Sequence, residues 1–181
     1  MKDLSLHILD IVQNSISAGA LEIKVSILED QDRDQYSMEI IDNGRGIKAE
    51  DLDRVTDPFF TSRTTRKVGM GLPLLKQNAE RTGGSLSISS TPGKGTSINV
   101  VFGWSNIDRP SMGDIGSTMA LLISSNPAIR FIYNHTTASG SFKLDTNEVI
   151  EMLDGLSITS APVYNFLKEM INENLREIQF S

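Results

Sequence analysis

The chain has 181 residues, enough for one ordinary domain with its own core, or for one domain with a small extension. Hydrophobic residues make up 39% and charged residues 22% of it, which is typical of a globular protein rather than a disordered one. The net charge of -6 argues against a nucleic-acid-binding surface, because such surfaces need clustered lysine and arginine. We therefore expect no nucleic acid among its partners.

The absence of certain features narrows the class further. The chain has no cysteine, which excludes disulfides, thiolate metal sites and a cysteine nucleophile. No apolar run approaches the roughly 20 residues of a membrane span. Residues 1–10 carry acids within their apolar stretch, unlike a signal peptide. We expect a cytoplasmic protein without a membrane span.

The first part of the chain predicts the order helix, two strands, loop, helix, two strands. Apolar residues recur at helical spacing over residues 4–18, and Gly19 follows as a natural stop. Alternation of apolar and polar residues predicts strands, and the glycine pair 83–84 closes the second helix. The expected strands are 21–29, 36–42, 85–90 and 96–104, and the second helix is "LPLLKQNAERTGG", residues 72–84.

The stretch between these halves is rich in threonine, glycine and charge. Residues 49–55 could form a short helix, whereas "DPFFTSRTTRKVGMG", residues 57–71, is typical of a mobile loop. Arg63, Arg66 and Lys67 form the one tight basic group of the sequence. This group predicts a local anion site at most.

The composition shifts beyond residue 106, so we divide the chain into a first domain, 1–106, and an α+β extension, 107–181. Small residues at helical spacing near the start of the extension suit close packing against the first domain or against a second subunit, as in a homodimer. The extension is expected to contain helices near 113–124, 147–154 and 161–178 and strands near 129–135 and 140–145.

The strand that ends in "DNGRG" has a ligand-binding pattern. Gly44 and Gly46 let the backbone bend and approach a flat ligand closely. The carboxylate of Asp42 stands beside that gap and can accept a hydrogen bond from an exocyclic amine. Adenine carries such an amine.

A second glycine pair, Gly69 and Gly71, stands directly before the second helix. Helix N-termini expose unpaired N–H groups at a positive dipole end, so this pair predicts a phosphate cradle. The turn "TPGKGT" adds Gly93 and Gly95, and Thr96 supplies a hydroxyl that could reach the base.

Asp10 and Asn14 lie four residues apart and therefore share one face of the first helix. An amide oxygen beside a carboxylate suits Mg²⁺, which takes one or two protein oxygens together with phosphate oxygens. Asp10 could instead orient a water. Taken singly, each motif also has an ordinary structural interpretation: a strand-ending turn, a solvated helix face or a hairpin.

In this order, "LDIVQNSISAGA", "DNGRGI", "DPFFTSR", "GMGLPLL" and "TPGKGT" resemble the GHKL family of ATP-binding proteins, over residues 4–103. That family includes histidine kinases, anti-sigma-factor kinases, type II topoisomerases, heat-shock chaperones and mismatch-repair ATPases. The resemblance implies an α+β protein with the Bergerat fold. This is a two-layer α/β sandwich with helices on one face of a mixed, mainly antiparallel sheet.

The resemblance also implies ATP and Mg²⁺ as cofactors and gives roles to single residues. Asn14 takes the place of the metal ligand, Asp10 that of the hydrolytic base, and Asp42 that of the adenine contact. The residues implied for nucleotide binding are Asn14, Asp42, Gly44, Gly46, Ile47, Phe60, Arg63, Lys67, Gly69, Met70, Gly71, Leu72 and Thr96.

The sequence departs from the family pattern in four ways. Hydrolases carry Glu at the position of Asp10 and histidine kinases commonly carry Asn, while Ser17 replaces a frequent Lys or Arg. Lys67 stands where many kinases have glycine, either as a solvated lysine or as a cation for the γ-phosphate, shared with Arg63 or Arg66. Members often have a strand and a helix ahead of the first motif, so the strands at 129–145, or a partner, would complete the sheet.

The leading functional hypothesis is a stand-alone kinase of histidine-kinase or anti-sigma-factor-kinase type, acting on a partner protein in signal transduction. His7 and His135 match no phosphoacceptor motif and are expected to be structural or surface residues, which places the acceptor on another protein. The alternatives are an ATP-hydrolysing conformational switch and a non-catalytic nucleotide-sensing scaffold.

Overall fold

The computed structural model describes residues 3–57 and 70–180 of the chain. The first part of the chain forms α1 (Leu4–Ser17), β1 (Glu22–Asp30), β2 (Gln35–Asp42), α2 (Ala49–Leu52), α3 (Gly71–Arg81), β3 (Ser85–Thr91) and β4 (Gly95–Gly103). The second forms α4 (Ile115–Ser125), β5 (Arg130–Thr137), β6 (Gly140–Asp145), α5 (Thr146–Met152) and α6 (Ala161–Phe180). The helices and strands expected from the sequence in these ranges are confirmed, with ends that differ by a few residues.

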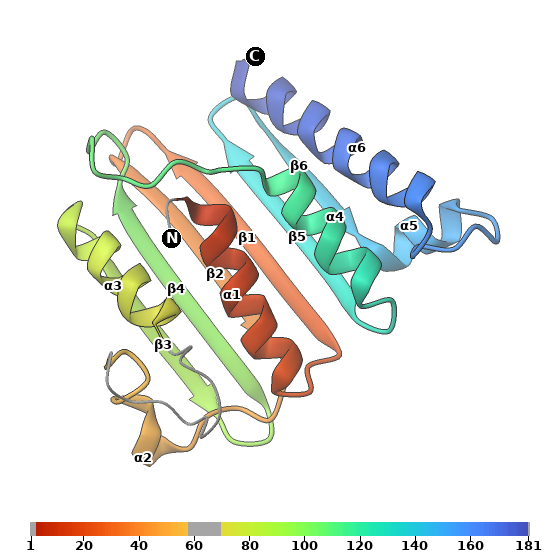
Figure 1. The fold of residues 1–181 in the computed structure, drawn as a ribbon. Coiled ribbons are helices and arrows are strands. Elements are labelled where there is room, and N and C mark those ends of the chain that lie inside the picture. The colour runs from red at the N-terminus through yellow and green to blue at the C-terminus, as the bar shows by residue number, and fades with distance from the viewer. Residues whose placement is uncertain (1–2, 58–69, 181) are drawn as a thin grey trace.

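The strands form one sheet of six, in the order β3-β4-β2-β1-β5-β6. Four of the neighbouring pairs are antiparallel, and β1 with β5 is the parallel one. The long helices α3, α1, α4 and α6 lie side by side across one face of this sheet (Figure 1). The expected fold class, a two-layer sandwich with helices on one face of a mixed, mainly antiparallel sheet, is confirmed.

The strands of the second part extend the sheet that the first part begins. Val25 of β1 is in register with Tyr133 of β5, and both side chains are completely buried. Of the two expectations for completing the sheet, the strands at 129–145 therefore do so at the β1 edge. The division into domains 1–106 and 107–181 stays a prediction.

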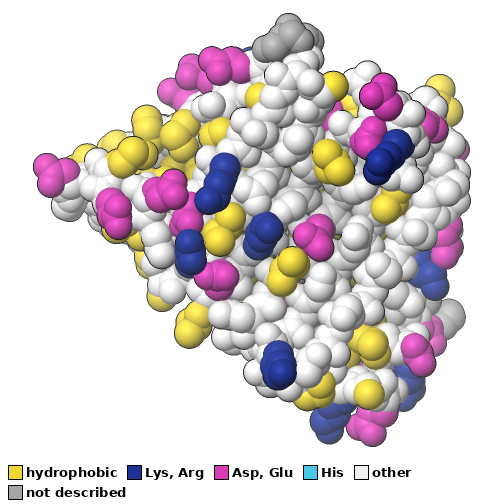
Figure 2. All heavy atoms as spheres, turned by 180° about the vertical axis from the view of Figure 1, so that it is seen from behind, with side chains coloured by type: hydrophobic (Ala, Val, Ile, Leu, Met, Phe, Trp, Pro, Cys, Tyr) yellow, Lys and Arg dark blue, Asp and Glu magenta, His cyan; other side chains and the backbone are white. Residues whose placement is uncertain are grey.

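Alternation along the strands separates a buried face from an open one. In β1, for example, Ile23, Val25 and Ile27 are buried beneath the helices, while the residues between them are more exposed. On the open face, acidic, basic and hydrophobic side chains are scattered over a surface formed mostly by backbone and other side chains (Figure 2). Its small polar residues include Ser26, Ser37, Ser85, Ser87, Ser89, Thr91, Ser97, Asn99, Asn134, Thr136 and Ser141.

The N-terminus of α1 is fixed at the middle of the molecule. Asp3 caps the helix by accepting a hydrogen bond from the N–H of Leu6 at 3.0 Å. The segment between β4 and α4 passes beside this end, where Ser111 and Met112 accept backbone hydrogen bonds from Leu4 and Ser5. Within residues 3–57 and 70–180, no helix is long and apolar enough to span a bilayer.

Candidate functional site

Asp42 ends β2 with its carboxylate buried and oriented by two donors. The hydroxyl of Ser15, on α1, donates to Oδ2 at 2.6 Å. The backbone N–H of Gly44 donates to Oδ1 at 2.8 Å. Each carboxylate oxygen has a further lone pair, so this group can still accept a hydrogen bond from a ligand amine.

The two glycines after Asp42 pack closely against neighbouring elements. A Cβ on Gly44 would come within 3.0 Å of Ala18, at the end of α1, and within 3.0 Å of the Asp42 carboxylate. Gly46 has a φ of +71°, and a Cβ there would lie 2.4 Å from the carbonyl oxygen of Thr91. The loop therefore needs glycine at position 46, whereas a side chain at position 44 would require its neighbours to shift by a few tenths of an ångström.

The turn between β3 and β4 lies beside the end of β2 that carries Asp42. Thr96 is in register with Asp42 on one side and with Ser90 on the other. The hydroxyls of Ser90 and Thr96 lie 2.9 Å apart, and Ser90 accepts the N–H of Ile47 at 2.8 Å. Gly95, with a φ of +121°, passes so close to Asp42 that a Cβ would lie 1.9 Å from its carbonyl oxygen.

The side chain of Asp10, a residue of α1, lies beside the N-terminus of α3. A Cβ on Gly71, the first residue of that helix, would lie 1.7 Å from the Oδ2 atom of Asp10. Because Gly71 has no side chain, the carboxylate of Asp10 occupies the space beside the helix N-terminus. Asn14 follows one turn later on α1 and is exposed.

The N-terminus of α3 has the features of an anion site. Met70 precedes the helix without a side-chain capping hydrogen bond, and half of its own side chain is exposed. The first N–H groups of a helix have no partner inside it, which leaves those of Gly71 and Leu72 to other acceptors. Eleven residues of aligned peptide dipoles favour negative charge at this end.

The candidate residues thus fall into two groups joined by α1. One lies at the end of β2 and comprises Asp42, Gly44, Gly46, Ile47 and Thr96. The other lies where α1 meets α3 and comprises Asp10, Asn14, Met70, Gly71 and Leu72. Phe60, Arg63, Arg66, Lys67 and Gly69 lie outside the described residues, as does most of the loop expected over 57–71.

Both histidines are buried. His7 lies on α1 with Nε2 3.2 Å from the amide nitrogen of Asn78 on α3, and burial lowers its pKa to about 4. His135 lies on β5 and contacts Glu29 and Tyr133. The expectation of structural residues agrees with these positions.

Two serines that hold the site were not among the sequence candidates. Ser15 orients Asp42, and Ser90 joins Ile47 to Thr96. Serine is common in helices and turns, so neither residue stands out by type. The only signal is positional: Ser15 directly follows Asn14, and Ser90 directly precedes the "TPGKGT" turn.

A family model described as histidine kinase-, DNA gyrase B- and HSP90-like ATPase matches residues 2–105, more than half of the chain. The match ends just after β4. The matched segment therefore includes both groups of candidate residues. It also includes the elements that position them, strands β1 to β4 and helices α1 to α3.

The similar curated proteins include bacterial sensor kinases. The sensor histidine kinase YxdK of Bacillus subtilis is 34% identical over 108 residues, which cover 56% of this chain and 33% of that protein. The sensor histidine kinase ZraS of Escherichia coli is 27% identical over 97 residues, covering 54% and 21%. The chain thus matches a third or less of the length of these relatives.

A solved structure extends the likeness into the second part of the chain. It is a crystal structure of the N-terminal domain of a DNA repair protein, with a TM-score of 0.55 and 20% identity, covering 80% of this chain and 52% of that one. At this identity the likeness shows the fold alone.

Proposed function

Since the chain belongs to the family of histidine kinase-, DNA gyrase B- and HSP90-like ATPases, we propose that it binds ATP with Mg²⁺ and transfers the γ-phosphoryl group to a partner protein. The observation that carries this proposal is the buried carboxylate of Asp42. It is held by Ser15 and Gly44 at the end of β2, where the chain enters a loop with two closely packed glycines. A carboxylate held in this way is suited to select one ligand amine.

Asp42 would accept a hydrogen bond from the exocyclic amine of adenine. Its two oxygens are fixed by their donors, so little conformational entropy is lost when the exocyclic amine adds one more hydrogen bond. Gly44 and Gly46 keep side chains out of the space beside it. Thr96, in register with Asp42, supplies a hydroxyl on the same side of the sheet.

The start of α3 would bind the phosphates. The N–H groups of its first turn and the helix dipole favour an anion, and the missing side chain of Gly71 leaves room for the Asp10 carboxylate beside them. Arg63 and Lys67 would add positive charge from the loop before it. Such cations stabilise a phosphoryl group most when they donate hydrogen bonds to its oxygens.

Asn14 would supply a protein ligand for Mg²⁺. Its amide is exposed on the same face of α1 as Asp10, and amide oxygen is a ligand of the type that this hard ion accepts. Among the residues that the structure describes, no group of three or more histidine, aspartate or glutamate side chains could hold a metal. The bound ion would neutralise charge on the phosphates, and Asn14 would hold it in place.

Asp10 is the residue proposed to act on the reacting atoms. Its carboxylate stands beside the N-terminus of α3, where the phosphates would bind. From there it can accept a proton from a water or orient the nucleophile, and the rest of the catalysis is positioning. Asp is one methylene shorter than Glu, so its reach depends on this close contact with Gly71.

The second candidate function is an ATP-driven switch. The same contact between Asp10 and Gly71 favours it, because a carboxylate at the phosphate site can activate water for hydrolysis as well as support transfer. Slow hydrolysis would then alter the loop before α3 or an interface. A nucleotide sensor without turnover is the third candidate.

Incubation with γ-labelled ATP and a cell extract distinguishes these functions. We expect label on a protein band other than this chain, and label released only as free phosphate would instead support the switch. Binding without any label transfer or release would support the sensor. If Asp10 is a base, an Asp10→Asn variant should keep ATP binding and lose ATP hydrolysis, and undiminished hydrolysis would remove Asp10 from that role.

A further inference from the structure

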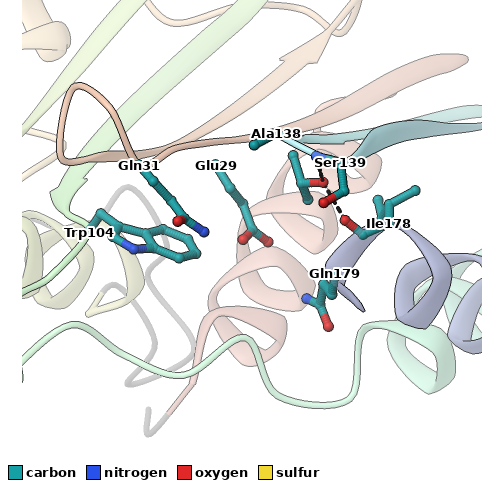
Figure 3. Close-up of a pocket in the computed structure, with 8 residues that line it drawn as sticks. Glu29, Gln31, Trp104, Ala138, Ser139, Ile178 and Gln179 are labelled. Atoms are coloured by element: carbon teal, nitrogen blue, oxygen red, sulfur yellow. Dashed lines mark hydrogen bonds between the residues drawn. The ribbon is translucent and has the colours of Figure 1, made fainter. Parts of the chain in front are cut away.

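A second polar site lies at the opposite end of the sheet from Asp42. A hollow of about 270 Å³ opens there between the ends of β1 and β4, the β5–β6 turn and the last turn of α6 (Figure 3). It is far larger than the space of one water and lies close to the lower end of the usual range for small-molecule pockets. The proposed ATP site does not use any of its residues.

Glu29 projects into this hollow from the end of β1, although only 7% of the residue is exposed (Figure 3). Its Oε1 atom lies 2.7 Å from Nε2 of His135, and Nδ1 of that histidine lies 2.8 Å from the hydroxyl of Tyr133. Among the described residues, the contacts of the Glu29 carboxylate involve Oε1 and not Oε2. Within the described part of the chain, no lysine or arginine forms an ion pair with Glu29.

Tyr133, His135 and Glu29 form a chain of hydrogen bonds that ends at the hollow. Burial raises the pKa of Tyr133 well above its usual value. When the hydroxyl of Tyr133 donates to Nδ1 of His135, Nε2 of the imidazole donates to Oε1 of Glu29. This contact uses one of the two oxygens of the carboxylate.

The residues around Glu29 are polar and predominantly acidic. Tyr36, its register partner on β2, is buried with a hydroxyl that has no hydrogen-bond partner in the described residues. The turn that follows Glu29 carries three acids, Asp30, Asp32 and Asp34, against one cation, Arg33. Burying a carboxylate costs free energy unless hydrogen bonds or an opposite charge compensate it. A cation from solvent can reach Glu29 through the hollow.

The walls of the hollow would suit an organic cation rather than a bare metal ion. The indole of Trp104 forms one side, and Gln31 lies between it and Glu29 (Figure 3). Ile178 of α6 forms part of the opposite side, and the hydroxyl of Thr137 donates to its carbonyl, which ties the β5–β6 turn to the helix. The other lining residues are Ala138 and the polar Ser139 and Gln179. A carboxylate with an aromatic ring and an aliphatic side chain nearby fits an alkyl chain with an ammonium group, and the polar groups can accept further hydrogen bonds from it.

Arg109 lies beside the same aromatic residues and is engaged with them. Its guanidinium lies 4.8 Å from the ring centres of both Tyr36 and Trp104, and its Nε donates to the carbonyl of Trp104 at 3.0 Å. Arg109 therefore packs on the rings of Tyr36 and Trp104, and within the described residues it does not form an ion pair with Glu29. We propose that the hollow binds a small aliphatic primary amine, with the ammonium group at Glu29 and the alkyl chain against Trp104.

The test uses the full chain without nucleotide. Trp104 is the only tryptophan in the sequence, so intrinsic fluorescence reports this wall directly. Titration with n-butylammonium should give a saturable change, while butyrate at the same ionic strength should give none. An equal response to both ions, or no saturable response to the amine, would overturn the proposal.

Variants separate binding at Glu29 from general effects. Glu29→Gln keeps an oxygen for His135 but removes the charge, and should weaken the apparent affinity for the amine at least tenfold. Gln31 is exposed at the rim, so Gln31→Lys should weaken binding about threefold and Gln31→Glu should strengthen it by a similar factor, without a cost to folding. Unchanged affinity in all three variants would contradict the site, whereas Asp42→Asn should leave the amine response intact.

Discussion

Ser15 and Asp42 join the first helix to the end of β2 through a hydrogen bond of 2.6 Å between buried side chains. This contact does more than fill space, because it fixes the direction in which the carboxylate presents its remaining lone pairs. At the scale of single residues, the proposed adenine contact would therefore depend on a hydroxyl from another element as well as on Asp42 itself.

Replacing Ser15 by alanine should weaken ATP binding about tenfold. A hydrogen bond to a charged group contributes roughly 1.5 kcal/mol or more, and its loss leaves Asp42 with one donor. Calorimetric titration with ATP measures the effect. Ser17→Ala is the matched control, because the hydroxyl of Ser17 is exposed and bonds only to the Gln13 carbonyl of its own helix. Equal affinities for the two variants would contradict the role of Ser15.

His7 should make the stability depend on pH. Its pKa is about 4 in the folded protein because the residue is buried, against about 6.5 in the unfolded chain. Between these values the unfolded state binds more protons, so the free energy of unfolding rises with pH across this window, by at most about 1.4 kcal/mol per pH unit.

A His7→Gln variant tests this contribution. Glutamine retains polar atoms toward Asn78 but does not titrate, so the difference in unfolding free energy between variant and wild type should change between pH 4 and 6.5 and be constant above it. Urea unfolding at several pH values provides the measurement. A constant difference over the whole range would show that His7 is not the titrating group.

At the scale of elements, the sequence pattern was sufficient for helices and strands but not for how they meet. Alternation and glycine positions predict the strands because one face of each is buried. The contact of Asp10 with Gly71 joins residues 61 positions apart, and no local pattern encodes it. The pairing of β1 with β5 is likewise not encoded locally, because the alternation of β5 fits any strand with a buried face. The sequence therefore left open whether the strands at 129–145 or a partner would complete the sheet.

Gly71→Ala should disturb the junction of α1 and α3. The new Cβ would lie 1.7 Å from Asp10 Oδ2, and overpacking of this kind typically costs 1–3 kcal/mol. Thermal or urea unfolding would record the loss. Combining it with Asp10→Ala removes the clashing carboxylate, so the double variant should regain stability. If it stays as unstable as Gly71→Ala alone, the contact is not the cause.

At the scale of the whole molecule, the six-stranded sheet makes the second part of the chain continuous with the part that matches the family model. α6 buries Leu167 completely and packs against α4, β5 and β6, while β5 pairs with β1. This arrangement predicts that the stability of both parts is shared. The candidate site could be predicted from the sequence because its glycines and Asp42 follow a spacing, whereas Ser15, Ser90 and the hollow at Glu29 depend on tertiary contacts.

Leu167→Ala in α6 tests this cooperativity. Truncation of a fully buried leucine typically costs 2–5 kcal/mol, and amide exchange should accelerate in β2 as well as in β5 and β6. Leu121→Ala on α4 is a suitable control because this side chain is 47% exposed. Faster exchange confined to α6, β5 and β6 would indicate two independent units.

The central claim is that Asp42 selects adenine, and calorimetric titration of Asp42→Asn with Mg-ATP tests it most directly. The amide keeps the size of the side chain but replaces one acceptor with a donor, so binding should be lost. Glu39→Gln, a carboxyl change on the open side of the same strand, should bind ATP like the wild type. Unchanged ATP affinity in a folded Asp42→Asn protein would contradict the account.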